Sequence, residues 1–167
     1  TATRIDHMKI TRISVYRADL PMKEGFYSWS TQSHSGFDTT VVTIDTDDGI
    51  TGTGECCPLG STYLPAYAEG VRAGIAAIAP ELIGQDPTHL DCINDTLDDL
   101  LKGHPYVKSA IDMACWDILG KTTALPLYTL LGGKQQDRAK LYKVVTRTDP
   151  DAMAARIPEY RAQGYRN

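Results

Sequence analysis

The sequence predicts an α+β domain followed by the first strand–helix unit of another domain. Three observations support this prediction. The β-branched run 39–46 and the run 50–55 flank the turn Asp47-Asp48-Gly49, which favours an antiparallel hairpin. Apolar residues recur at helical spacing through most of 65–119. Residues 140–160 then combine a strand pattern with a helix pattern. A single parallel unit cannot bury its own strand, so we expect the chain to be truncated at Asn167.

The first part is expected to be a three-stranded antiparallel meander. Residues 9–19 alternate loosely and predict the strand that precedes the hairpin. Residues 22–38 are rich in Gly, Ser and aromatic residues without a period, which predicts a long loop.

A bundle of helices is expected to follow the sheet. Pro65 suits the first turn of one helix, which Pro80 ends, and Asp86-Pro87-Thr88 caps a second. A third helix is predicted from about Tyr106 to Leu119, with Gly120 at its end, and a short turn of helix over 127–131. In the last unit, residues 140–146 predict a strand, and Asp149-Pro150 opens a helix that Gly164 ends.

Composition excludes several classes of protein. The 167 residues carry a net charge of −4 and no run of Lys or Arg, which argues against a nucleic-acid partner. No apolar stretch approaches the roughly 20 residues that span a membrane, and the N-terminus shows no signal peptide. The four cysteines are expected to be reduced thiols of a cytoplasmic protein. Met8-Lys9-Ile10 resembles a natural start, so residues 1–7 are either an added or disordered leader or part of the protein.

Three stretches resemble one family. They are Gly52-Thr53-Gly54-Glu55, residues 110–121 (AIDMACWDILGK) and residues 126–133 (PLYTLLGG). Together they resemble the enolase superfamily, in its mandelate racemase and muconate lactonizing enzyme family. The resemblance implies that residues 8–133 form the family's N-terminal capping domain and that residues 134–167 begin its TIM-type β/α barrel.

Finer features resemble one subgroup. Residues 55–65 and 103–110 are similar to enzymes that dehydrate cis-3-hydroxyproline or epimerize proline betaine. The resemblance implies removal of a proton next to the carboxylate of a small-molecule substrate, with Mg²⁺ stabilizing the enediolate. The bases and the Mg²⁺ ligands of such enzymes lie at the barrel strands. We therefore expect no catalytic residue and no metal ligand within this chain, and a homo-oligomeric enzyme.

The resemblance also implies which residues contact substrate. Two capping loops, here Pro21–Asp38 and Cys56–Leu64, are expected to close over the barrel mouth. Tyr63 is the leading candidate, because an aromatic face can hold a ring ammonium by cation–π attraction. Trp29 and Tyr27 are candidates in the first loop, where they could instead anchor the loop to its own domain.

Other conspicuous residues are expected to be structural. Asp112, Trp116, Asp117 and Lys121 share one helix, and the resemblance assigns them to joining the capping helices to the barrel. His34 is expected to be a solvated loop residue. Sugar-acid dehydratase, dipeptide epimerase and muconate-type lactonizing activities remain alternatives within the family. A non-catalytic α+β binding module is the alternative from another class.

Overall fold

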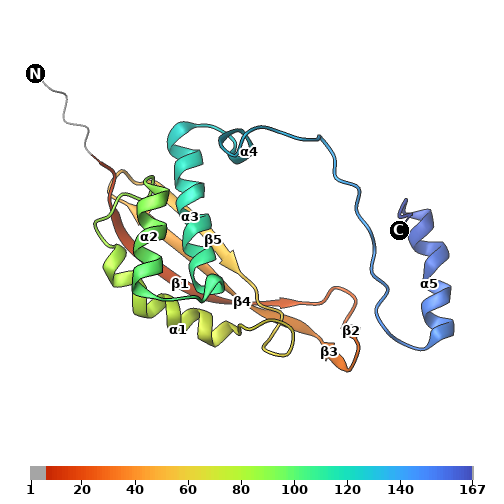
Figure 1. The fold of residues 1–167 in the computed structure, drawn as a ribbon. Helices are drawn as coiled ribbons and strands as arrows, with labels where there is room; N and C mark the ends of the chain where they lie inside the picture. Colours follow the sequence, from red (N-terminus) through yellow and green to blue (C-terminus); the bar gives the residue numbers. More distant parts are fainter. Residues whose placement is uncertain (1–6, 167) are drawn as a thin grey trace, which may run out of the picture. The chain divides into compact units, whose positions relative to one another are not determined.

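The computed structural model describes residues 7–166, so residues 1–6 of the expected leader lie outside the described residues. The chain forms two compact units (Figure 1). The first contains the residues up to Asp19 together with Asp38–Gly133, and the second contains Leu20–Phe37 together with the residues from Lys134 onward. Each unit is described by itself.

The sheet of the first unit consists of β1 (Ile10–Pro21), β4 (Gly36–Thr46) and β5 (Thr51–Cys56), in the order β1-β4-β5. β4 and β5 pair antiparallel, from Thr40 opposite Cys56 to Asp45 opposite Thr51. Gly49 supplies the positive φ, 77°, at the turn between them. The predicted order of three strands and the predicted hairpin are confirmed.

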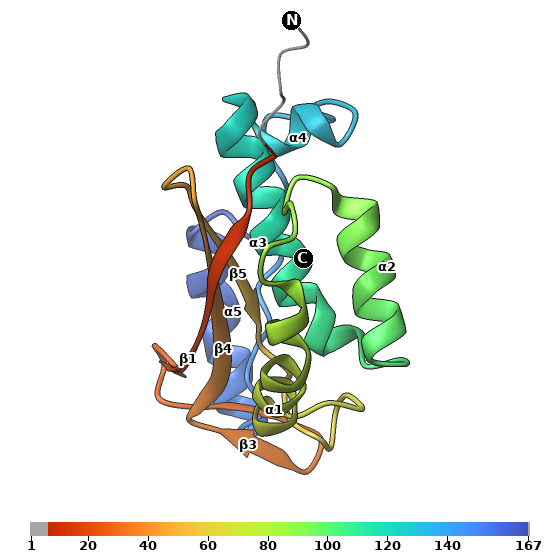
Figure 2. The ribbon, with the colours of Figure 1, turned by 90° about the vertical axis from the view of Figure 1, so that its left-hand side faces the viewer.

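Helices cover one face of this sheet. They are α1 (Ala68–Ile78), the 3₁₀ turn η1 (Ala79–Leu82), α2 (Leu90–Leu100) and α3 (Pro105–Thr123), followed by the short α4 (Leu127–Leu130). Figure 2 shows α1, α2 and α3 on the same side of the strands. The core between sheet and helices is aliphatic; its largest fully buried side chains include Ile10, Val42, Ile44, Val71, Ile75, Leu82, Ile93, Leu97, Ile111 and Ile118.

Two predicted helix boundaries are wrong. α1 begins at Ala68 rather than near Pro65. α3 continues through Gly120 to Thr123, because Ala124 takes the left-handed conformation that ends it, with φ 53°. The Ala124 N–H donates to the carbonyl of Lys121, and the Leu125 N–H donates to that of Gly120.

Glycines allow α3 to lie directly on β5. A Cβ atom at Gly54 would come within 1.9 Å of the Ala110 carbonyl oxygen, and one at Gly52 within 2.1 Å of the Ala114 carbonyl oxygen. Both separations are far inside van der Waals contact, so a side chain at either position would push helix and strand apart. The G-x-G pattern is therefore a packing requirement.

Polar contacts from α3 complete this interface. Asp117 Oδ2 accepts a hydrogen bond from the Thr53 backbone N–H at 2.8 Å, and it forms an ion pair with Lys121 Nζ at 2.8 Å. Lys121 Nζ also donates to the Thr51 carbonyl at 2.7 Å. β5 lies at the edge of the sheet, so α3 satisfies backbone groups that would otherwise face solvent. These contacts fix α3 on the sheet edge within the first unit.

The second unit contains β2 (Tyr27–Trp29), β3 (Gln32–His34) and α5 (Pro150–Ala162). β2 and β3 form a small antiparallel hairpin within the segment predicted to be a loop, so that prediction was incomplete. Asp149 caps α5 by accepting from the Asp151 and Ala152 backbone N–H groups, as predicted. The predicted strand at 140–146 is wrong for this structure: a strand needs a hydrogen-bonded neighbour, and no described segment pairs with it.

We predict that Asp117→Ala lowers the free energy of unfolding by about 1–2 kcal/mol, because it leaves the Thr53 N–H without its acceptor and removes the carboxylate that pairs with Lys121. The measurement is chemical denaturation at neutral pH. Asp99→Ala is the control, since Asp99 pairs with Lys102 and the two side chains are 86% and 80% exposed; its effect should stay below about 0.5 kcal/mol. Equal effects of the two variants would contradict the structural role of Asp117.

Candidate functional site

The segment Cys56–Leu64 leaves the end of β5 and carries Tyr63. Gly60 has a φ of 97°, and its carbonyl accepts hydrogen bonds from the backbone N–H groups of Tyr63 (3.0 Å) and Leu64 (3.2 Å). This turn presents the Tyr63 side chain at the surface of the first unit, where 58% of the residue's area is exposed. An aromatic ring with that exposure has area available for a ligand.

Polar contacts hold the start of this segment. Thr39 Oγ1 donates to the Glu55 carboxylate at 2.8 Å and lies 3.1 Å from the Cys56 carbonyl oxygen. Through this hydrogen bond, Glu55 helps to hold the start of the Cys56–Leu64 segment against β4. Burial raises the pKa of the Cys56 and Cys57 thiols, which keeps them protonated and poorly suited to act as nucleophiles. All four cysteines are free thiols.

The aromatic residues of the first predicted loop pack on one another. The Trp29 ring stacks on the His34 ring with centroids 4.8 Å apart, and Tyr27 lies 5.1 Å from Trp29. The Phe37 ring lies 5.2 Å from His34. Trp29 and Tyr27 are half-buried, and this packing fixes the hairpin that carries them.

His34 differs from its prediction as a solvated residue. Its ring packs against both Trp29 and Phe37, and its Nε2 atom is buried without a hydrogen-bond partner among the described residues. The β3 strand brings His34 back alongside β2, opposite Tyr27, and this pairing places it in the aromatic cluster.

An ion-pair cluster around Glu24 joins the 20–37 segment to the C-terminal residues of the second unit. Glu24 accepts from Lys143 Nζ at 2.8 Å, Arg156 Nη1 at 2.9 Å and the Tyr160 hydroxyl at 3.4 Å. The hydrogen bond from Lys143 is the largest cause that lowers the Glu24 pKa. The sequence analysis missed this cluster, because its partners lie 119 to 136 residues from Glu24 and share no local pattern.

A backbone contact and a groove lie beside this cluster. The Arg147 N–H donates to the Ser28 carbonyl at 3.1 Å. A groove of about 390 Å³ is lined by residues of the 21–27 segment, including Glu24 and Tyr27, and by Lys143, Val144 and Thr146. The 20–37 segment and residues 143–147 therefore lie against each other within the second unit and share a groove of mixed polar and apolar lining.

The described residues offer one group of three or more metal-ligating side chains, formed by His7, Asp86 and His89. Mg²⁺ prefers six oxygen ligands in octahedral geometry. Two of these three ligands are imidazoles, so the group does not fit Mg²⁺. The sequence analysis did not find the group, because His7 lies far along the chain from the other two.

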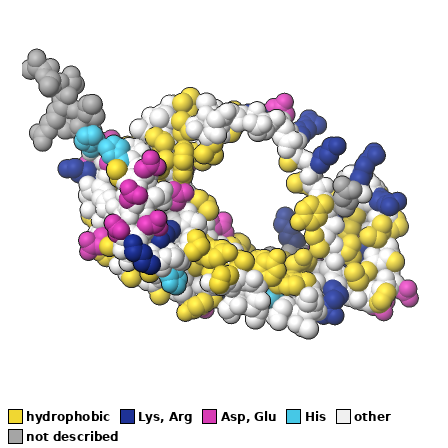
Figure 3. Space-filling model, in the orientation of Figure 1, with side chains coloured by type: hydrophobic (Ala, Val, Ile, Leu, Met, Phe, Trp, Pro, Cys, Tyr) yellow, Lys and Arg dark blue, Asp and Glu magenta, His cyan; other side chains and the backbone are white. Residues whose placement is uncertain are grey.

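Acidic side chains form a distinct region on the surface of the first unit. Acidic side chains gather over α2, at the left of Figure 3; this helix carries Asp91, Asp95, Asp98 and Asp99. Within residues 7–166, no helix is both long and apolar enough to cross a membrane.

Comparisons with known proteins identify several relatives. The chain is 55% identical over 159 residues to a cis-3-hydroxy-L-proline dehydratase of Roseibium aggregatum, covering 95% of this chain and 43% of that protein. It is 33% identical to an N-succinyl-L-Arg/Lys racemase of Bacillus cereus, covering 96% and 43%. A magnesium-complexed crystal structure of an enolase-superfamily member from Roseovarius nubinhibens superposes with a TM-score of 0.85 at 48% identity, covering 95% and 43%.

The chain thus spans less than half the length of the relatives it matches. The sequence model described as the mandelate racemase / muconate lactonizing enzyme N-terminal domain matches residues 8–132. This match covers most of the chain and includes β5, the helices α1 to α4 and the Tyr63 segment. The chain therefore belongs to the mandelate racemase and muconate lactonizing enzyme family, of which it carries the N-terminal domain.

Proposed function

We propose that this chain is the N-terminal part of an enzyme that removes the proton next to the carboxylate of a proline-derived substrate. Dehydration of a cis-3-hydroxyproline is the leading reaction, and epimerization of such a substrate or of proline betaine is the alternative. The observation that carries the proposal is the 55% identity to a cis-3-hydroxy-L-proline dehydratase, which extends over 159 residues and so covers nearly all of this chain.

In this proposal the chain contributes substrate contacts, and residues outside it supply the bases. Magnesium, when bound by the whole enzyme, supplies positive charge next to the developing enediolate; a related structure contains magnesium. The described residues hold no group that fits this ion. The chain's own part is to bind and orient the ring of the substrate and to exclude water, through Tyr63 and the aromatic hairpin with Trp29 and Tyr27.

Location and assembly form a further part of the proposal. The four free thiols suit a reducing compartment, which supports a cytoplasmic enzyme. Assembly into a homo-oligomer rests on the family resemblance.

The decisive assay uses the full-length protein with cis-3-hydroxy-L-proline, proline betaine and a sugar acid. We expect turnover of a proline-derived substrate that requires added Mg²⁺. Turnover of the sugar acid alone would overturn the substrate class and leave the family membership intact. Absence of turnover with every carboxylate tested would favour a non-catalytic binding module.

We predict that Tyr63→Ala raises KM for the proline-derived substrate by about tenfold while kcat falls less. The ring ammonium is present in both the ground state and the transition state, so loss of the aromatic face removes binding to both. Tyr63→Phe should keep most of the activity, because the ring face is retained.

Tyr16→Ala is the matched control for Tyr63→Ala, since Tyr16 is a similarly exposed tyrosine on β1, with 53% of its area accessible. Steady-state kinetics of the three variants in the full-length protein are the measurement. If kcat/KM is the same for Tyr63→Ala and for Tyr16→Ala, Tyr63 has no part in substrate binding.

We predict that Glu24→Gln loosens the 20–37 segment. Removal of the charge leaves Lys143 and Arg156 without their carboxylate, so backbone amides of this segment should exchange hydrogen at least several-fold faster. The Glu24 pKa is lowered, so the contribution of this cluster is complete at neutral pH and disappears only as acid protonates Glu24 below its usual range.

The control for this variant is Glu81→Gln in the exposed turn η1, which should leave the 20–37 segment unchanged. Hydrogen exchange followed by mass spectrometry measures residues 20–37 and the turn η1 separately. Lys143→Gln should reproduce the Glu24→Gln result. Unchanged exchange of residues 20–37 in both Glu24→Gln and Lys143→Gln would show that the ion pairs do not hold the segment.

A further inference from the structure

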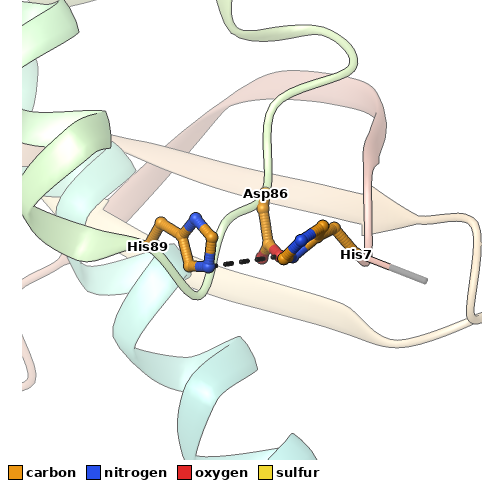
Figure 4. A group of neighbouring side chains, drawn as sticks. All are labelled: His7, Asp86 and His89. Atoms are coloured by element: carbon orange, nitrogen blue, oxygen red, sulfur yellow. Dashed lines mark ion pairs between the residues drawn. The ribbon is translucent and has the colours of Figure 1, made fainter. Parts of the chain in front are cut away.

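We propose that His7, Asp86 and His89 form a binding site for one divalent transition-metal ion of the zinc class. Figure 4 shows the imidazoles of His7 and His89 on either side of the Asp86 carboxylate. His7 belongs to the segment before β1, and His89 belongs to the turn before α2. The three side chains come from two segments that meet only in the folded chain.

The spacing of the ligand atoms suits a zinc ion. His7 Nδ1 lies 3.4 Å from Asp86 Oδ2, and His89 Nε2 lies 3.8 Å from the same oxygen. All three ligand atoms lie within 4.8 Å of one another. Two ligands at tetrahedral angles, each about 2.1 Å from a zinc ion, are about 3.4 Å apart. Zinc binding would therefore draw the exposed His89 side chain closer to Asp86.

Hydrogen bonds from Thr88 already orient the Asp86 carboxylate for metal binding. Asp86 Oδ1 accepts hydrogen bonds from the Thr88 backbone N–H at 2.9 Å and from the Thr88 hydroxyl at 2.6 Å. These bonds leave Oδ2 facing the imidazoles, as hydrogen bonds to ligating carboxylates do in metal sites. The Asp86 side chain is 12% exposed, whereas those of His7 and His89 are 59% and 52% exposed. The fourth position therefore opens to solvent and can hold water.

Two backbone hydrogen bonds fix the distance between the two ligand segments before any ion binds. The Ile10 N–H donates to the Gln85 carbonyl at 2.9 Å, and the Gly84 N–H donates to the Ile10 carbonyl at 2.8 Å. These bonds hold the start of β1 beside the turn at 84–86, so that His7, three residues before Ile10, lies next to Asp86. Ion binding would then require little ordering of the backbone.

The helix next to the site carries acidic side chains in addition to its dipole. The acidic side chains of α2, including Asp91 in its first turn, offset the positive end of the helix dipole next to His89. The mixture of two imidazoles and one carboxylate selects zinc or a similar transition metal over Mg²⁺ or Ca²⁺. The competing explanation for the cluster is a pair of imidazolium–carboxylate ion pairs with no metal.

The test titrates the full-length protein with Zn²⁺ by calorimetry at pH 7.5, with Mg²⁺ in excess so that any magnesium site is filled. We expect the wild type to bind one more equivalent of zinc than His89→Ala or His7→Ala. Thr88→Val should weaken this binding about tenfold, because it removes one hydrogen bond that orients Asp86.

His104→Asn is the matched control. It removes an exposed histidine outside the cluster, and asparagine tolerates the left-handed backbone of this position, where φ is 50°. This variant should bind as many zinc equivalents as the wild type. Equal zinc uptake by the wild type and by His89→Ala would overturn the proposal and leave only ion pairs at this cluster.

Discussion

The structure of the first unit depends on the close approach of α3 to β5. At Gly52 and Gly54 the helix backbone occupies the space that a side chain would fill. This contact lets the aliphatic faces of the helices meet the sheet, and it brings Asp117 and Lys121 within reach of the β5 backbone. The segment that carries Tyr63 starts where β5 ends, so its starting position is set by the same contact.

The second unit is held together largely by ion pairs rather than by an aliphatic core. The segment 20–37 has a small aromatic cluster and a short hairpin but few buried aliphatic residues. Its attachment to residues 143–160 relies on charge, through Glu24, Lys143 and Arg156. Ion pairs that are partly exposed stabilise weakly, so this segment is expected to open more easily than the first unit.

Much of the fold was predictable from local patterns. The Asp-Asp-Gly turn, the G-x-G strand and the helical stripes each act within a few residues, and all three appear in the structure as expected. The motif residues Asp112 and Asp117 also have structural contacts, with Asn94 and with the Thr53 backbone.

The remaining features depend on contacts that no local pattern records. α3 passes Gly120 because its end is set by hydrogen bonds at Ala124 and Leu125. Residues 140–146 have strand-like composition, but a strand also requires a neighbour, which the described residues do not provide. The Glu24 cluster and the group of His7, Asp86 and His89 join residues distant in sequence. Tyr63, Trp29 and Tyr27 remain predicted substrate contacts, which the exposure of Tyr63 supports.

The most direct test of the central claim is the stability of Gly54→Ala, measured by denaturant unfolding beside Thr53→Ala. Replacing glycine with alanine in a strand normally stabilises a protein by up to about 1 kcal/mol through the unfolded chain. Here the new Cβ would meet the Ala110 carbonyl oxygen, so the account predicts a loss of about 3 kcal/mol. Thr53→Ala, on the exposed side of β5, should lose less than about 1 kcal/mol. Stability of Gly54→Ala equal to or above that of the wild type would contradict the account.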